Sequence, residues 1–188
     1  MPFRLRPATE SDLPLLGTIH QSAISTFAQI PELAAAECSL PPLPLALLQT
    51  FEVVIAVEDS ADGGATGDPE AAAERIKGFV ALRLLDGVAF IAMICVRATD
   101  QRQGVGRELL AHAIAQSETR GFRAISLTTF RDVPWNGKWY RQMGFAEIAD
   151  KEVETELGPE HMTMLRGSRD KHELDGSPWR WVVMARWL

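Results

Sequence analysis

Short apolar blocks separated by polar or proline-containing stretches predict alternating strands and helices in the first part of the chain. Residues 3–7 (FRLRP) predict a short strand that ends at a proline. Apolar residues then recur at helical spacing through 13–19, so we expect a helix that Thr9 or Ser11 caps and that runs to about residue 28. The following segment, 31–50, is apolar and rich in proline, and it predicts a helix only at about 44–50.

A three-stranded antiparallel meander is predicted next. Residues 51–58, 76–85 and 88–97 are rich in Val, Ile and Leu and have strand lengths. The Asp-Gly pair at 86–87 is typical of a tight hairpin turn. Residues 59–74 hold acids, glycines and one proline without a base, which predicts a flexible acidic loop inside the first hairpin.

The second half continues the alternation. It predicts a helix at about 104–120, a strand at 122–130, a short helix at 135–143, a strand at 145–154 and a last strand at 180–188. Residues 155–179 are polar and predict an irregular segment with a short helix around 161–166. This order favours an α/β chain of the α+β type, with a mostly antiparallel sheet and helices on its faces, over a doubly wound parallel sheet.

Composition and charge narrow the class of protein. The 188 residues, 46% of them hydrophobic, suit a single domain over 1–188. A net charge of −6 argues against a nucleic-acid partner, which usually meets a basic face. The longest strongly apolar run, 88–96, is far shorter than the roughly 20 residues that span a bilayer. We therefore expect no membrane partner and a cytoplasmic location. Cys38 and Cys95 form no CxxC pair, so buried thiols are expected rather than a disulfide or a metal site.

The candidate chemistry begins at residues 101–106, QRQGVG, between a predicted strand and a predicted helix. Closely spaced glycines let the backbone approach a ligand, and a helix N-terminus directs free N–H groups outward, so the segment predicts a pyrophosphate site. A helix start that merely contains glycine remains an alternative. A dinucleotide-binding loop is another, because Gly104 and Gly106 begin a GxGxxG pattern. Leu109 stands at the third glycine position, which disfavours that interpretation.

QRQGVG also matches the Q/R-x-x-G-x-G/A acetyl-CoA signature of the GNAT superfamily of N-acetyltransferases. The surrounding ICVRATDQRQGVGRELLAHAI resembles the family's strand, turn and long helix. Further along, LTTFRDVPWNGKWYRQMGFAE is similar to a second family block, marked here by Asn136, Trp139, Tyr140 and Gly144-Phe145. The C-terminal RWVVMARWL resembles the closing strand of one branch. The resemblance spans nearly the whole chain and implies a mostly antiparallel mixed sheet of about seven strands with helices on both faces.

The resemblance implies acetyl-CoA as co-substrate and no metal. In the family, the strand matching 88–97 splays from the strand matching 122–130, and its unpaired backbone groups bind the pantetheine arm. Ile94 and Val96 match those positions, with side chains expected in the core. The backbone N–H groups that would hold the pyrophosphate belong to Gln103, Gly104, Val105, Gly106 and Arg107. Gln101 and Arg102 would lie at the loop entrance, where Arg102 either meets phosphate or stays solvated.

The reaction that the resemblance implies is direct attack of an amine on the thioester, which needs no protein nucleophile. A backbone N–H near Ile94 or Cys95 would meet the oxyanion. Tyr140, the chain's only tyrosine, matches the acid that protonates the departing thiolate. Its ordinary pKa of about 10 is close enough to a thiol's for proton sharing. Packing alone is the alternative for Tyr140. Asn136, one helical turn earlier, either contacts the pantetheine or the acceptor, or caps the helix.

The general base and the acceptor are not defined by the sequence. The strand 88–97 contains no acid, so the carboxylate base of some family members has no counterpart there. The remaining candidates are Asp132, Glu37, Glu32 and His20, or a chain of waters. His112 is expected on an exposed helix face, and His161 and His172 are candidates to face the acceptor. A small-molecule or peptide amine is the expected acceptor. A homodimer and a catalytically inactive acyl-CoA-binding module remain open alternatives.

Overall fold

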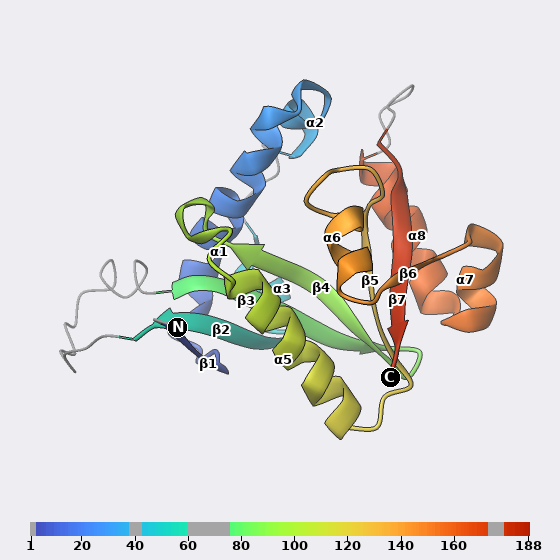
Figure 1. The fold of residues 1–188 in the computed structure, drawn as a ribbon, viewed down its shortest axis with the longest axis horizontal. Helices are drawn as coiled ribbons and strands as arrows, with labels where there is room; N and C mark the ends of the chain where they lie inside the picture. Colours follow the sequence, from blue (N-terminus) through green and yellow to red (C-terminus); the bar gives the residue numbers. More distant parts are fainter. Residues whose placement is uncertain (1–2, 38–42, 60–75, 173–178) are drawn as a thin grey trace. The chain divides into compact units, whose positions relative to one another are not determined.

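The computed structural model describes residues 3–37, 43–59, 76–172 and 179–188. Most of the expected acidic loop at 59–74, and Cys38, lie outside these described residues. The described strands form one seven-stranded sheet in the order β1-β2-β3-β4-β5-β7-β6 (Figure 1). Strands β4 and β5 are parallel, whereas the pairs β1–β2, β2–β3, β5–β7 and β6–β7 are antiparallel. The predicted class, a mostly antiparallel mixed sheet with helices, is confirmed.

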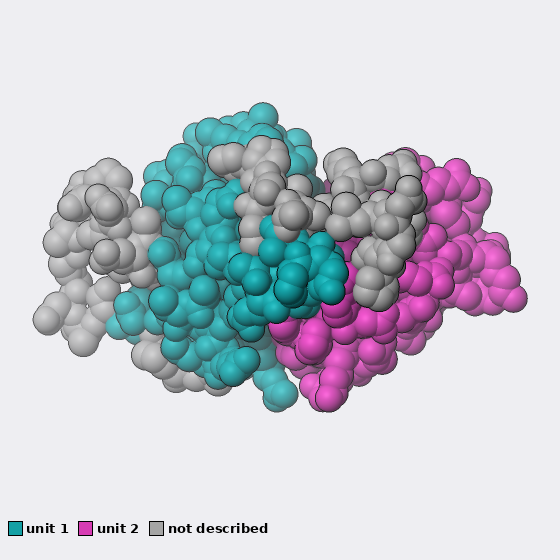
Figure 2. Space-filling model, turned by 90° about the horizontal axis from the view of Figure 1, so that it is seen from above, with its two compact units in different colours: residues 1–82, 93–113 teal, residues 83–92, 114–188 magenta. Residues whose placement is uncertain are grey.

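The chain divides into two compact units, which Figure 2 distinguishes by colour. The first unit contains Met1–Leu82 and Met93–Ala113, and the second contains Arg83–Ala92 and Ile114–Leu188. Strands β3 and β4 and helix α5 each contribute residues to both units.

The first unit is built on the N-terminal strands and the helices between them. Its elements are β1 (Phe3–Pro7), α1 (Leu13–Ile24), a 3-10 turn η1 (Ser25–Gln29), α2 (Pro31–Glu37), α3 (Leu45–Leu48), β2 (Glu52–Glu58), most of β3 (Ile76–Leu85), the end of β4 (Val88–Val96), the 3-10 turn η2 (Ala98–Asp100) and the start of α5 (Val105–Thr119). Apolar residues of α1, β2 and β3 form its core, with Leu16, Ile19, Ile55 and Phe79 all fully enclosed. Their burial fixes α1 against the sheet.

The second unit is built on the C-terminal strands. Its further elements are β5 (Ala124–Phe130), α6 (Gly137–Gln142), β6 (Ala146–Ile148), α7 (Asp150–Glu156), α8 (Pro159–His172) and β7 (Trp181–Trp187). Val153 of α7, Leu157 just after it, Leu165 of α8 and Val183 of β7 belong to its core. The Asp86–Gly87 turn between β3 and β4 has positive φ at both residues (50° and 73°), as the predicted tight hairpin turn requires.

Several sequence predictions are wrong in detail. Helix α1 begins at Leu13, and Asp12 occupies the N-cap position, where its carboxylate bonds Arg6 and Thr9 rather than the helix. Residues 31–37 form α2, which was not expected. The predicted strand 145–154 ends at Ile148, because residues from Asp150 onward form α7. The segment predicted as irregular contains the fourteen-residue helix α8.

The polar composition of α7 and α8 concealed their helical pattern. The buried residues are few: Val153 in α7 and Leu157 at its C-cap, and His161 and Leu165 in α8. The remaining described side chains of both helices are exposed or half-buried. Pro159 at the first position of α8 and Glu160 in its first turn were the available start signals.

Candidate functional site

The QRQGVG segment connects the end of β4 to α5 in the first unit. Its backbone has positive φ at Arg102 (61°) and at Gly104 (89°). Left-handed residues alternating with right-handed ones turn successive N–H groups toward one side, which makes a concave anion site. The Glu108 N–H donates to the Gly104 carbonyl (3.1 Å) and closes the first turn of α5. The N–H groups of the three residues between them precede the helical hydrogen bonds and are available to an anion.

The loop's side chains divide into two kinds. Gln101 and Gln103 donate back to the preceding turn, Gln101 Nε2 to the Val96 carbonyl at 3.3 Å and Gln103 Nε2 to the Thr99 carbonyl at 3.0 Å. These amides therefore stabilise the loop itself. Arg102 and Arg107 are exposed and place positive charge around the free N–H groups. Val105 is the buried anchor of the segment, at 1% exposed.

Ile94 and Val96 lie near the end of β4. The parallel register of β4 and β5 runs from Ala89 opposite Ile125 to Ile91 opposite Leu127, and both predicted residues lie beyond that last pair. Both side chains are half-buried. Cys95 between them is buried, and burial raises the pKa of its thiol to about 12. A thiol that stays protonated at neutral pH is a poor nucleophile, which suits a reaction without a covalent enzyme intermediate.

Tyr140 and Asn136 lie in the second unit, on the helix that follows β5. Tyr140 is 8% exposed, and its ring lies 4.8 Å from that of Trp139 and 5.7 Å from that of Phe145, measured between centroids. Asn136 occupies the N-cap position of α6, and its carbonyl accepts the Tyr140 N–H at 3.0 Å. Its side chain, however, makes no capping hydrogen bond, so the capping alternative holds for its backbone only.

A close backbone contact places α6. A Cβ atom added to Gly137 would lie 2.2 Å from the Arg131 carbonyl oxygen, so only glycine fits there. Arg131 in turn donates through Nε to Glu147 Oε2 at 3.0 Å, which ties the end of β5 to β6. The Asn-Gly pair of the second motif thus has a steric role in presenting Tyr140.

The candidates for a general base are dispersed. In the first unit, Glu32 is exposed in the first turn of α2, and His20 is half-buried in α1. Asp132 is exposed in the second unit. His112 on α5 is half-buried rather than exposed as expected. The side chains of Glu37 and His172 lie outside the described residues.

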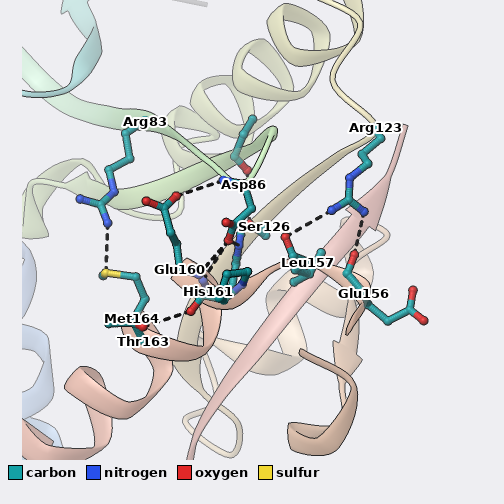
Figure 3. Close-up of polar contacts among 12 residues, drawn as sticks. Arg83, Asp86, Arg123, Ser126, Glu156, Leu157, Glu160, His161, Thr163 and Met164 are labelled. Atoms are coloured by element: carbon teal, nitrogen blue, oxygen red, sulfur yellow. Dashed lines mark hydrogen bonds and ion pairs between the residues drawn. The ribbon is translucent and has the colours of Figure 1, made fainter. Parts of the chain in front are cut away.

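His161 is a buried member of a hydrogen-bonded cluster that the sequence did not predict (Figure 3). Its Nε2 lies 2.8 Å from Ser126 Oγ and its Nδ1 lies 3.1 Å from Asp86 Oδ2. Asp86 Oδ2 also accepts the Glu160 N–H at 2.9 Å, and Glu160 Oε2 accepts the Asp86 N–H at 3.1 Å. We call these four residues the α8 clasp, because they join the β3–β4 turn and β5 to the start of α8. Sequence separations of 74 and 75 residues leave no local signal for it.

The hydrogen-bonded sequence Ser126–His161–Asp86 resembles the catalytic triad of a serine hydrolase, but the burial of Ser126 and His161 indicates another role. Ser126 is 0% exposed and His161 is 1% exposed, so no acyl group can reach the serine hydroxyl. Burial lowers the pKa of His161, against the opposing effect of the Asp86 carboxylate. A neutral imidazole protonated at Nδ1 donates to Asp86, and its Nε2 lies 2.8 Å from Ser126 Oγ, whose hydroxyl also lies 3.3 Å from the Ala89 carbonyl. We interpret the clasp as a structural link. The sequence made His161 a candidate to face the acceptor, but its side chain is buried in the clasp instead.

Within the described ranges, no three His, Cys, Asp or Glu side chains lie close enough together to hold a metal ion. None of the described helices is both long and apolar enough to cross a membrane.

Comparison with known proteins identifies the family. Residues 46–145 match the model of the acetyltransferase (GNAT) family. The chain therefore belongs to the GNAT acetyltransferase family, as its motifs indicated. This match covers the QRQGVG segment and the block that carries Asn136 and Tyr140.

Solved structures with this fold include three enzymes of low sequence identity. The ribosomal-protein-S18-alanine N-acetyltransferase from Escherichia coli is 17% identical, with a TM-score of 0.63 over 98% of this chain and 93% of that one. The PaiA N-acetyltransferase from Thermoplasma acidophilum, in complex with coenzyme A, is 16% identical, with a TM-score of 0.63 over 100% of both chains. N-acetylglutamate synthase from Neisseria gonorrhoeae, complexed with coenzyme A and N-acetyl-glutamate, is 17% identical, with a TM-score of 0.59 over 99% of this chain and 35% of that one.

Proposed function

We propose that the protein is an acetyl-CoA-dependent N-acetyltransferase that acts on a primary amine of a small molecule or peptide. The observation that carries this proposal is the loop of residues 101–107, whose left-handed Arg102 and Gly104 lead directly into the free N–H groups of α5. This arrangement suits the pyrophosphate of coenzyme A. The coenzyme A bound in the similar PaiA structure supports the same ligand class here.

The proposed roles follow the sequence motifs. The backbone of Gln103, Gly104, Val105, Gly106 and Arg107 binds the pyrophosphate, with Arg102 beside it. The backbone of Ile94 and Val96 binds the pantetheine arm, and Gln101 holds the loop through its bond to the Val96 carbonyl. Asn136, whose side chain is not used as a cap, contacts the pantetheine or the acceptor.

The chemical step is a direct transfer. The amine nitrogen attacks the thioester carbonyl, the C–N bond forms and the C–S bond breaks. The amine loses a proton to solvent or to a base, and the departing thiolate takes one from the hydroxyl of Tyr140, which regains it from solvent. The high pKa of Cys95 agrees with a step that uses no enzyme thiolate.

The acyl-transfer proposal predicts that wild-type protein releases free thiol from acetyl-CoA when a suitable amine is present. Tyr140→Phe should retain acetyl-CoA affinity, because the ring packing on Trp139 and Phe145 is kept. Its single-turnover rate should fall by about 10²–10⁴-fold, the usual contribution of a positioned general acid. A panel of amines, amino acids and alanine-terminated peptides would define the acceptor.

Three results would contradict parts of this proposal. Stabilisation of the protein by NADH but not by millimolar acetyl-CoA would exclude the acyl-CoA site. Binding of acetyl-CoA without turnover across the amine panel would favour an inactive acyl-CoA-binding module. A Tyr140→Phe rate within about twofold of wild type would assign thiolate protonation to water instead of Tyr140.

A further inference from the structure

Lys77, the second residue of β3, is a buried cation in the first unit. The residue is 8% exposed, and lysine is almost never buried without a charged partner. Its Nζ lies 2.7 Å from Asp100 Oδ1 and 3.2 Å from Glu58 Oε1. The Asp100 side chain is itself 14% exposed, whereas that of Glu58 is 48% exposed. The inner, better shielded partner of Lys77 is therefore Asp100.

Asp100 connects Lys77 to the loop of residues 101–107, because it is the last residue of η2 and precedes Gln101. The Asp100 N–H donates to the Arg97 carbonyl at 2.8 Å, and the Arg97 N–H donates to the Lys77 carbonyl at 2.8 Å. Lys77 thus holds both ends of this turn, Arg97 through its backbone and Asp100 through its ammonium group. A shift of the turn would displace the loop that follows it.

The loop depends on such an attachment because little of it is buried. Arg102, Gln103 and Arg107 are exposed, and Val105 is the buried residue between them. Charge adds a second reason. Asp100 places a carboxylate one residue before a site proposed to bind two phosphates, and an unpaired carboxylate there would repel them. The hydrogen bond to Asp100 raises the pKa of Lys77, so the ammonium remains charged and offsets that repulsion.

We propose that Lys77 is a positioning residue for acetyl-CoA: through Asp100 it fixes the turn that enters the loop of residues 101–107, and it neutralises the carboxylate that directly precedes that loop. This inference rests on the proposed acetyl-CoA site and adds a residue 24 positions before the QRQGVG motif. Lys77 contacts the loop's support, and no direct contact with the substrate is invoked.

The test compares acetyl-CoA with acetyl-pantetheine, which carries the same thioester but no pyrophosphate. Lys77→Met should raise KM for acetyl-CoA by about tenfold or more, since displaced binding groups lose their alignment. It should leave KM for acetyl-pantetheine and kcat at saturating acetyl-CoA within about twofold. Lys77→Arg should recover part of the acetyl-CoA affinity, because it restores the charge. Arg4→Met is the matched control, since it removes an exposed ion pair with Asp59 in the same unit.

The double variant Lys77→Met/Asp100→Asn separates two effects of Lys77, neutralising the Asp100 carboxylate and anchoring the turn. It removes the carboxylate that Lys77→Met alone leaves unpaired. Partial recovery of acetyl-CoA affinity in this double variant would support the electrostatic part of the proposal.

If Lys77→Met does not fold, the same KM comparison can be made with Lys77→Arg and with the single Asp100→Asn variant. Equal KM changes for both thioesters, or acetyl-CoA affinity unchanged by calorimetry in a folded variant, would overturn the proposal. Absence of acetyl-CoA binding by wild type would instead overturn the proposed function.

Discussion

The two units each contain a buried polar cluster, and the clusters differ in charge and in what they hold. In the first unit, charged Lys77 pairs with Asp100, which directly precedes the loop of residues 101–107. In the second unit, His161 joins Asp86 and Ser126 and fixes the start of α8. Burial is compatible with a charged lysine because two carboxylates surround it, whereas His161 has one carboxylate on one side and a hydroxyl on the other. The first cluster supports a proposed binding loop, and the second supports a helix.

The comparison predicts different phenotypes for changes in the two units. Variants around the loop should alter acetyl-CoA affinity more than stability, and variants of the α8 clasp should alter stability more than affinity. Three experiments test this contrast.

The largest effect is expected from Gly104→Val and Gly106→Val in the first unit. Each adds a branched side chain where the phosphates approach, so acetyl-CoA affinity should fall by at least about tenfold in both. Gly104 has φ of 89°, so its variant should also lose about 1–3 kcal/mol of unfolding free energy through backbone strain. Gly106 lies within α5 without a positive φ, so its variant should keep most of its stability. Calorimetry and urea unfolding measure the two quantities, and unchanged affinity in both variants would exclude the phosphate cradle.

A smaller effect, on stability alone, is expected from Asp86→Ala in the second unit. The change leaves the Glu160 N–H and the His161 Nδ1–H without their acceptor and should cost about 1–3 kcal/mol of unfolding free energy. Asp86 has φ of 50°, so Asp86→Asn is a companion variant that tolerates the same backbone conformation. Asp59→Ala is the control, because its ion pair with Arg4 is exposed and contributes little. Equal unfolding free energies for Asp86→Ala and Asp59→Ala would show that the clasp does not stabilise the second unit.

The same contrast explains what the sequence could predict. The 86–87 turn, α5 and all of the predicted strands except 145–154 depend mainly on neighbouring residues, and the structure confirms those elements. Both buried clusters depend on residues far apart in the sequence. Lys77 and Asp100 are 23 residues apart, and Asp86 and His161 are 75 apart. Periodicity carries no information on such pairs, and Lys77 lies in a mostly apolar strand where nothing local indicates its partner.

Helices α7 and α8 escaped prediction for a related reason. Their stability comes from a few residues packed on β7, such as Val153 and Leu165, rather than from a wide apolar face. Arg169 adds a tertiary link, because its guanidinium bonds both Asp150 oxygens at 2.9 and 3.0 Å. The sequence of a helix that depends on such tertiary partners has no clear apolar periodicity, so it predicts an irregular segment.

The smallest effect is expected in the pH dependence of stability. The folded-state pKa of His161 lies below its ordinary value of 6.5, so the folded protein binds this proton less readily than the unfolded chain. Its contribution to stability is therefore fully present above about pH 6.5 and is lost as the pH falls through the lower folded-state pKa. Desolvation lowers this pKa, Asp86 and Glu160 oppose the shift, and Arg123 adds to it.

Comparison of wild type with His161→Asn isolates this titration, because asparagine keeps a donor for Asp86 and carries no ionisable group. Urea unfolding from pH 7.5 to pH 5 should show wild type more stable than the variant at the upper end, with the gap narrowing toward the lower end. The gap should not reflect Asp12 of the first unit, because its pKa is lowered to about 2 and it loses its contribution only in stronger acid. A gap that widens as the pH falls would show that His161 is charged in the folded protein. The two clusters would then both be ionic, and the contrast between the units would rest on their positions alone.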